Sequence, residues 1–344
     1  MMRLPVFPLL VKPAGPDCNL ACPYCFYLEK RSLFPGAVHR MSMETLERLI
    51  GDYLALGFER GSITFQGGEP LLMDEEFFRR AQELGNNKID FSVQTNGTLL
   101  PPSLARFFAE NHWLVGVSVH DRSEAMLRGV KLLREAGADY NVLALITKDN
   151  VAVPEELYRY CRDALGGKFL QFIECVHPVS HAITAEQWGE FLCRVYDLWR
   201  AEGDVHRISV RLFDSLVSQR TFGRPTLCQF GGDCRNYLVI EHNGDIYPCD
   251  FFVERELRLG NLLERGEINP LAAAFLSPEF AAFGARKKTL PPDCFRCEYR
   301  TLCQGDCPRS RENGRSVLCR GWRRFFDHIA TRTKIIIFPL EISP

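Results

Sequence analysis

The sequence predicts an α/β protein in which a partial (β/α)6 barrel is followed by a cysteine-rich domain. From residue 9 to about residue 172, short apolar runs rich in β-branched residues alternate with segments of helical period, as in parallel α/β folds. After Arg220 the composition changes to Gly, Pro and Cys, so this region is too rich in loops to depend on an apolar core alone. We therefore expect one domain over residues 1–220, including bridging helices, and a second over residues 221–344 that ends in a helix.

The barrel is expected to contain strands separated by amphipathic helices. The expected strands are Phe7–Lys12, Ser62–Gln66, Ile89–Thr95, Leu114–Val119, Asn141–Thr147 and Phe169–Ile173. The expected helices are Met43–Leu56, Glu75–Leu84, Ser103–Glu110, Glu124–Ala136 and Pro154–Ala164. Ser42 and Asp74 are expected to be N-caps. In such a barrel the functional residues lie at the C-terminal ends of the strands.

Three later segments have their own patterns. Residues 185–220 have a helical pattern with apolar residues at core-like spacing, and we expect them to pack and to bridge the domains. In the second domain, a strand at Tyr237–Glu241 is expected to enter a tight turn at His242–Asp245. The apolar stretch Ile335–Phe338 is strand-like and far shorter than the roughly 20 residues that cross a bilayer.

Composition and charge favour an ordinary folded protein of the cytoplasm. Hydrophobic residues make up 46% of the 344 residues and charged residues 25%, which is enough to bury a large core. The 42 basic and 43 acidic side chains give a net charge of −1 and no broad cationic surface for nucleic acid. Arg3, Pro5 and Pro8 interrupt the apolar N-terminus, and a cleavable signal would remove the cysteines that begin at Cys18. We expect neither a nucleic acid nor a membrane as a partner.

The chain has fourteen cysteines. In the cytoplasm thiols stay reduced, so clustered cysteines more often bind metal than form disulfides. Cys161, Cys175 and Cys193 stand apart from the clusters and are expected to be buried in apolar packing.

The first cysteine cluster, Cys18, Cys22 and Cys25, has the spacing C-x3-C-x2-C directly after the first predicted strand. A four-iron cluster held by three thiolates leaves one iron open, which can chelate the amino and carboxylate groups of S-adenosylmethionine (SAM). Electron transfer into the sulfonium then breaks a C–S bond and gives a 5′-deoxyadenosyl radical. The alternative is zinc, but a structural zinc normally has four ligands and no neighbouring His supplies the fourth.

This motif, with Tyr24 directly before its last cysteine, resembles the signature of the radical SAM superfamily. Gly67-Gly68-Glu69-Pro70 is similar to the superfamily motif whose backbone and Glu hold the SAM amino group. An ordinary structural turn is the alternative. The resemblance implies further SAM contacts, some of which could instead be strand-end caps: Tyr24, Thr95, Asn96, Ser118, Arg122 and Leu170.

The cysteines of the second domain resemble those of SPASM domains. Eight thiolates can fully ligate two further cubane clusters, which gives three [4Fe-4S] clusters in all. Because full ligation leaves neither auxiliary cluster with an open iron, these two clusters suit electron transfer or structural support. Paired zinc ribbons are the alternative. The resemblance assigns Cys228, Cys234, Cys249 and Cys307 to the first auxiliary cluster, and Cys294, Cys297, Cys303 and Cys319 to the second.

Among SPASM proteins, the chain is most similar to anaerobic sulfatase-maturating enzymes. The similarity lies in Lys12–Gly15, Cys25–Lys30, Thr64–Pro70, Gln94–Gly97, Phe169–Glu174 and Gly244–Asp250. It implies oxidation of a Cys or Ser in a sulfatase polypeptide to Cα-formylglycine under anaerobic conditions, with reduced ferredoxin or flavodoxin as electron donor. Asp250 matches the family's general base, and Tyr27 and Gln66 match residues that line the substrate pocket. A solvated Asp near a turn, and ordinary polar residues at the barrel mouth, are the alternatives.

One segment departs from the family pattern. The family has a longer loop after the fourth strand, whereas here Ser118 is followed by Val119-His120-Asp121-Arg122 and then directly by a helix. This shortening affects the expected Arg122 contact and the surface that would bind a sulfatase. One alternative function is therefore a SPASM maturase of a ribosomally made peptide, forming a thioether, a carbon–carbon crosslink or an epimerised residue. Another is a non-enzymatic iron–sulfur electron carrier.

Overall fold

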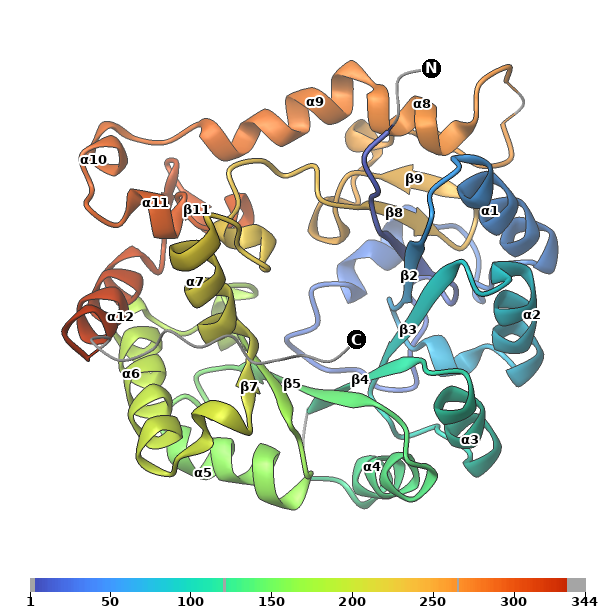
Figure 1. Cartoon of the computed structure of the whole chain (residues 1–344). Coiled ribbons are helices and arrows are strands. Elements are labelled where there is room, and N and C mark those ends of the chain that lie inside the picture. Colours follow the sequence, from blue (N-terminus) through green and yellow to red (C-terminus); the bar gives the residue numbers. More distant parts are fainter. Residues whose placement is uncertain (1–3, 120–121, 265, 333–344) are drawn as a thin grey trace. The chain divides into compact units, whose positions relative to one another are not determined.

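The computed structural model describes residues 4–119, 122–264 and 266–332 (Figure 1). The chain divides into two compact units, and each unit is built from two segments. The first unit contains Met1–Asn141 and Asp233–Arg286, and the second contains Val142–Gly232 and Lys287–Pro344. The predicted strand-like stretch Ile335–Phe338 lies outside the described residues.

The first unit contains a mixed sheet with the strand order β10-β9-β8-β1-β2-β3-β4. Four strands of the predicted barrel are parallel neighbours: β1 (Leu9–Lys12), β2 (Gly61–Phe65), β3 (Ile89–Thr95) and β4 (Leu114–Val119). On the other side of β1 lies β8 (Leu238–Glu241), which is also parallel to β1 and continues into antiparallel β9 (Asp245–Tyr247) and β10 (Gly260–Asn261). The predicted turn thus joins β8 and β9, and residues from the cysteine-rich region extend the sheet.

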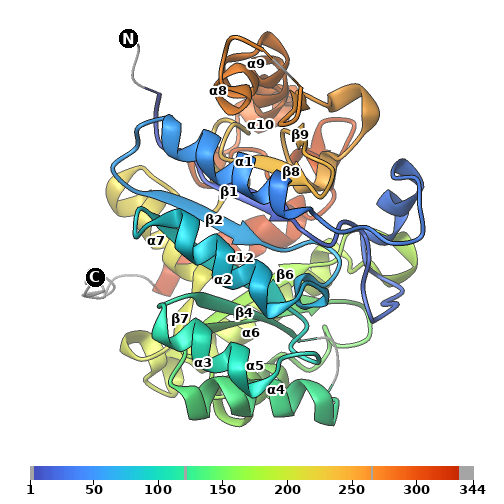
Figure 2. The same ribbon diagram turned by 90° about the vertical axis from the view of Figure 1, so that its right-hand side faces the viewer.

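Amphipathic helices follow the strands of the first unit, and Figure 2 shows α1 and α2 beside β1 and β2. The hydroxyl of Ser42 accepts a hydrogen bond from the Thr45 N–H, and Asp74 accepts one from the Phe77 N–H, so both predicted N-caps are confirmed. The helices are α1 (Met43–Ala55), α2 (Glu75–Gly85), α3 (Pro102–Glu110), α4 (Glu124–Ala136), α8 (Pro270–Leu276) and α9 (Pro278–Ala285).

The second unit contains three parallel strands: β5 (Tyr140–Ile146), from Val142 onward, then β6 (Phe169–Glu174) and β7 (Ser209–Val210). The predicted helix after β5 is α5 (Pro154–Arg159), continued by a π-helical turn at Tyr160–Ala164. The remaining elements are α6 (Ala185–Ala201), α7 (Arg211–Phe222), α10 (Pro292–Phe295), α11 (Arg300–Cys303), the hairpin β11 (Arg311–Glu312) and β12 (Arg315–Ser316), and α12 (Cys319–Arg332).

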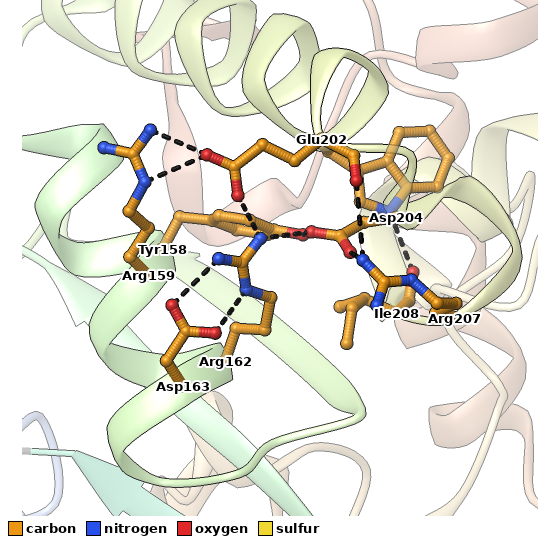
Figure 3. Close-up of polar contacts among 9 residues, drawn as sticks. Tyr158, Arg159, Arg162, Asp163, Glu202, Asp204, Arg207 and Ile208 are labelled. Atoms are coloured by element: carbon orange, nitrogen blue, oxygen red, sulfur yellow. Dashed lines mark hydrogen bonds and ion pairs between the residues drawn. The ribbon is translucent and has the colours of Figure 1, made fainter.

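The expectation of helical structure throughout residues 185–220 is wrong at its centre. Gly203 has a φ of +70°, which ends α6, and the chain then forms β7 beside β6 before α7 begins. A buried carboxylate holds this connection. Asp204 accepts hydrogen bonds from Arg162, at 2.6 Å, and from the Tyr158 hydroxyl, at 2.7 Å (Figure 3). A helical pattern in sequence does not reveal such a polar anchor.

Helix α12 packs closely on α6 through glycine. A Cβ atom at Gly321 would lie 2.1 Å from the backbone oxygen of Ala185, so no larger residue fits there. The predicted C-terminal helix is therefore present and docked within the second unit. The isolated cysteines Cys161, Cys175 and Cys193 are buried, as expected. Among the described residues, no helix is both long enough and apolar enough to cross a membrane.

Candidate active site

The loop that carries the first cysteine cluster is held by the loop after β2. The N–H of Gly68 donates to the Gly15 oxygen at 2.8 Å, and the N–H of Glu69 donates to the Asp17 oxygen at 2.7 Å. A Cβ atom at Gly68 would lie 1.8 Å from the Asp17 oxygen, so only glycine permits this approach. The Gly-Gly-Glu-Pro motif therefore fixes the backbone just before Cys18.

Asp17 anchors the other side of the same loop. Its carboxylate accepts hydrogen bonds from the His39 N–H at 2.8 Å, from His39 Nδ1 at 2.9 Å and from Arg40 Nη1 at 2.8 Å. Burial acts to raise the pKa of Asp17, but the hydrogen bonds from His39 and Arg40 hold that pKa below its usual range. The residue before Cys18 is thus a buried, ionised carboxylate, a feature the sequence motif does not reveal.

The thiol of Cys18 is harder to ionise than a free thiol, in part because of the other two cysteines of the motif. Burial raises the pKa of Cys18, and Glu69, Cys22 and Cys25 raise this pKa further. A bound cationic iron centre offsets such repulsion, because metal ligation requires the thiolate form. The three cysteines therefore fit the predicted cluster.

Glu69 is buried at the centre of the predicted SAM site. Its carboxylate accepts hydrogen bonds from the Thr95 hydroxyl at 2.7 Å, the Asn96 N–H at 2.8 Å and the Leu71 N–H at 2.9 Å. Burial raises the pKa of Glu69 to about 7, against the lowering effect of these hydrogen bonds. The side-chain nitrogen of Asn96 also donates to Asn19 Oδ1 at 2.9 Å, which links the end of β3 to the cysteine loop.

The other predicted SAM contacts lie at different places in the two units. Ser118 lies at the end of β4, where Gln94 Nε2 is 3.4 Å from its hydroxyl. Tyr24 is half-buried, and Arg122 is exposed just before α4, which begins at Glu124 after the N-cap Ser123. Leu170 is buried in β6 of the second unit.

A second group of polar residues surrounds Asp250 in the first unit. Gln66 Nε2 donates to Asp250 Oδ2 at 3.1 Å, so the structure brings together two predicted site residues that are 184 positions apart. The Tyr237 hydroxyl donates to Asp250 Oδ1 at 2.8 Å and lies 3.3 Å from Cys249 Sγ. The carboxylate itself is buried. Tyr237 was not identified from the sequence, because nothing there distinguishes it from the many other aromatic residues of the chain.

Tyr27 is buried and its hydroxyl donates to Glu241. The Lys12 ammonium lies 4.3 Å from the centroid of the Tyr27 ring, within the range of a cation–π interaction. Lys12 and Glu241 end the apolar strands β1 and β8, and a charged residue at such a position was the available signal for them.

The cysteines of the second auxiliary set influence one another electrostatically. Burial raises the pKa of Cys319, and Cys294 and Cys297 raise it further. Burial also raises the pKa of Cys303 to about 12, and Cys319 contributes to this shift. The pKa contributions link Cys319 with Cys294, Cys297 and Cys303, the four cysteines that the resemblance assigns to the second auxiliary cluster, and four thiolates are the donor set of a four-iron cluster.

The first auxiliary set is divided between the units, with Cys234 and Cys249 in the first and Cys228 and Cys307 in the second. Burial raises the pKa of Cys307 to about 12, with smaller contributions from Asp306 and Cys228. All fourteen cysteines lie within the described residues, and none of them forms a disulfide there.

Asp306 is a buried residue that organises the loop between Cys303 and Cys307, and the sequence reasoning missed it. Its carboxylate accepts from the Cys307 N–H at 2.7 Å, from the Ser316 hydroxyl at 2.6 Å and from the Trp322 indole at 2.9 Å. The adjacent glycine, Gly305, was the available signal for a tight turn here.

Two family models match the chain on its two cysteine motifs. The model of the radical SAM superfamily matches residues 13–161. The SPASM model, described as an iron–sulfur cluster-binding domain, matches residues 228–298. Together they define the class: a radical SAM enzyme with a SPASM domain.

Relatives and solved structures give the family within this class. The serine-type anaerobic sulfatase-maturating enzyme of Bacteroides thetaiotaomicron is 33% identical over 94% of this chain and 89% of that protein. The cysteine-type enzyme of Clostridium perfringens is 31% identical over 96% of this chain and 98% of that protein. The structure of anSMEcpe with bound AdoMet and the Cp18Cys peptide has a TM-score of 0.86 and 28% identity, covering 95% of this chain and 98% of that one. The chain belongs to the family of anaerobic sulfatase-maturating enzymes.

This membership confirms the predicted fold class, the predicted enzyme class, SAM and [4Fe-4S] clusters as cofactors, and a polypeptide as substrate. It favours sulfatase maturation over the peptide-maturase alternative, and an electron carrier without enzymatic activity is excluded. The roles of individual residues and the domain boundary at residue 220 stay predictions.

Proposed function

We propose that this chain oxidises a Cys or Ser side chain of a sulfatase polypeptide to Cα-formylglycine, with Asp250 as the general base. The observation that supports this role most is the setting of the Asp250 carboxylate, which is buried between Gln66 and Tyr237 and beside Cys249. A buried carboxylate with a donor on each oxygen has a fixed orientation, unlike a solvated Asp near a turn. Fixed orientation is what a general base needs.

The residues present fit three cysteine-bound clusters and one SAM. Cys18, Cys22 and Cys25 would hold the SAM-binding cluster, and Glu69 with its partners Thr95 and Asn96 would receive the SAM amino group. When bound, SAM and its cluster supply the radical that removes a hydrogen atom from the substrate Cβ, and the auxiliary clusters supply an electron acceptor. The auxiliary ligands would be Cys228, Cys234, Cys249 and Cys307 in one set, and Cys294, Cys297, Cys303 and Cys319 in the other.

The oxidation removes one hydrogen atom, one proton and one electron from the substrate CH2–XH group, where X is oxygen or sulfur, and leaves C=X. Asp250 takes the proton from the hydroxyl or thiol. Gln66 and Tyr237 each donate to a different oxygen of Asp250, so the carboxylate keeps its orientation while it does this. A Ser substrate gives the aldehyde directly, whereas a Cys substrate gives a thioaldehyde whose hydrolysis releases sulfide.

Further residues are proposed to border the two ligands. Tyr27, whose hydroxyl donates to Glu241, is proposed to line the substrate pocket. Around SAM we propose contacts from Gly67, Gly68, Pro70, Tyr24, Ser118, Arg122 and Leu170. The electron donor is proposed to be reduced ferredoxin or flavodoxin in the cytoplasm.

The experiment that tests this function is an anaerobic assay with a peptide that contains a Cys/Ser-x-Pro-x-Arg sequence. Reduced enzyme with SAM should convert the Cys or Ser into an aldehyde that reacts with a hydrazide, as detected by mass spectrometry. Asp250→Asn keeps the shape of the side chain but cannot take the proton, so it should slow peptide oxidation by about 100-fold or more while SAM still binds. An unchanged sulfatase peptide, together with productive SAM cleavage on an unrelated peptide, would contradict the proposed substrate.

A further inference from the structure

The hydroxyl of Tyr237 contacts two groups with different proposed tasks. This hydroxyl donates to Asp250 Oδ1 at 2.8 Å, and the hydroxyl oxygen of Tyr237 also lies 3.3 Å from Cys249 Sγ. We propose that Tyr237 is a positioning residue that fixes the base carboxylate and the cluster-ligand sulfur relative to each other. This inference rests on the proposed function of Asp250 and on the proposed ligation of iron by Cys249.

The contacts of Asp250 come from two separate elements. Gln66, directly after β2, donates to Oδ2, and Tyr237, directly before β8, donates to Oδ1. A carboxylate held at only one oxygen can rotate about its last bond, whereas donors at both oxygens fix its plane. Oδ1 also receives a contact from the Cys249 thiol at 3.7 Å, whereas Oδ2 has a second lone pair that remains available for the substrate proton. Tyr237 therefore supplies half of the restraint that keeps Asp250 in position.

The location of the Tyr237 hydroxyl is set by packing. Its ring is half-buried and packs against a buried cluster formed by Tyr27, Phe34, Val239, Tyr247 and Val253. Because the ring has only two rotatable side-chain bonds and apolar neighbours, the hydroxyl can be removed without loss of this packing. Tyr237→Phe is therefore a substitution that changes the two polar contacts and little else.

Through its contact with Cys249, Tyr237 would also influence the potential of the cluster that this cysteine binds. The potential of an iron–sulfur cluster depends on hydrogen bonds and dipoles near its cysteine sulfurs. A phenol at 3.3 Å from Cys249 Sγ is such a dipole. Loss of the hydroxyl should therefore shift the potential of the auxiliary cluster that Cys249 binds, and leave the other clusters as they are.

The test compares reconstituted wild-type enzyme with Tyr237→Phe and with a matched control, Tyr53→Phe. Tyr53 is a buried tyrosine of the same unit, and its hydroxyl donates to the Phe7 oxygen at 2.6 Å, among residues with no proposed role in the reaction. Tyr237→Phe should retain full iron content and shift the midpoint potential of one auxiliary cluster. It should also slow aldehyde formation by about tenfold and raise the ratio of 5′-deoxyadenosine to aldehyde, because the base is less well placed. Tyr53→Phe should change neither the potentials nor this ratio.

Combining the substitution with Asp250→Asn separates positioning from a structural role. Because Tyr237 acts through Asp250, Tyr237→Phe should slow the Asp250→Asn enzyme by less than twofold. A further tenfold loss in the double variant, loss of iron in Tyr237→Phe, or potentials and a product ratio equal to those of the wild type would each overturn the proposal.

The potential of the auxiliary cluster is measured without substrate. A wild-type enzyme that fails to oxidise the sulfatase peptide would therefore contradict the proposed function, while the shift of the potential would still decide the link between Tyr237 and Cys249.

Discussion

Lys12 and Glu241 lie opposite each other on the neighbouring parallel strands β1 and β8, and both side chains are fully buried. Tyr27 contacts both residues. Its hydroxyl donates to Glu241, and its ring lies below the Lys12 ammonium. The arrangement joins the first strand of the barrel to a strand of the cysteine-rich region. It also fixes Tyr27, two residues after Cys25, a predicted ligand of the first cluster.

The first prediction concerns this buried pair of opposite charges. Glu241→Gln keeps an acceptor for the Tyr27 hydroxyl but removes the carboxylate that lies across from the buried Lys12 on the neighbouring strand. The free energy of unfolding should fall by about 3–5 kcal/mol, as measured by urea denaturation under anaerobic conditions. Glu110→Gln, at an exposed position on α3, is the control and should change stability by less than about 0.5 kcal/mol. If Glu241→Gln lowers the free energy of unfolding no more than Glu110→Gln does, the buried charge of Glu241 does not contribute to stability.

The second prediction concerns Glu69. In Glu69→Gln one carboxylate oxygen becomes an amide nitrogen, which would meet either the Asn96 N–H or the donors of Thr95 and Leu71. Two donors would then face each other in a buried site, at a cost of about 1–3 kcal/mol. We expect the rate of 5′-deoxyadenosine formation to fall at least tenfold, as measured by liquid chromatography. A rate equal to that of Glu110→Gln would remove Glu69 from the SAM site.

The third prediction concerns iron content. Eleven cysteine ligands in one three-ligand and two four-ligand sites correspond to about twelve irons per chain after anaerobic reconstitution. Simultaneous replacement of Cys18, Cys22 and Cys25 by Ala should leave about eight irons and abolish SAM cleavage. Iron near four in the wild type, with zinc at the remaining sites, would reduce the protein to a single-cluster enzyme.

The fourth prediction concerns pH and the buried network of the second unit (Figure 3). Burial acts to raise the pKa of Asp204, but hydrogen bonds from Arg162 and Tyr158 hold it below the usual value of 3.8. The folded state therefore binds fewer protons than the unfolded state near this pKa. The stabilisation from Asp204 is fully present above about pH 4 and is lost as the pH falls through the folded pKa.

Asp204→Asn should accordingly lower the free energy of unfolding by about 3 kcal/mol at pH 7. The difference from the wild type should shrink below pH 4. Asp163→Asn is the matched control, because Asp163 also pairs with Arg162 but is exposed, and it should cost less than about 1 kcal/mol. An Asp204→Asn variant whose stability differs from the wild type equally at pH 3 and pH 7 would contradict this explanation.

Local features of the fold were predictable from the sequence. The caps Ser42 and Asp74 and the strand β3 follow from short-range rules, and the cysteine motif lies after β1 as expected. Contacts between distant segments were not predictable. The pairing of β1 with β8, and the approach of Gln66 and Tyr237 to Asp250, depend on tertiary packing that no local pattern encodes. The break of the helical segment at Gly203 likewise depends on Asp204, whose partner Tyr158 lies in α5.

The measurement that tests the proposed reaction most directly uses a sulfatase peptide with deuterium at Cβ of the target Cys or Ser. Reduced wild-type enzyme and SAM should give the peptide aldehyde together with 5′-deoxyadenosine that contains one deuterium, as resolved by mass spectrometry. Aldehyde formation with no deuterium in 5′-deoxyadenosine, or labelled 5′-deoxyadenosine with a peptide that carries a crosslink instead of an aldehyde, would contradict it.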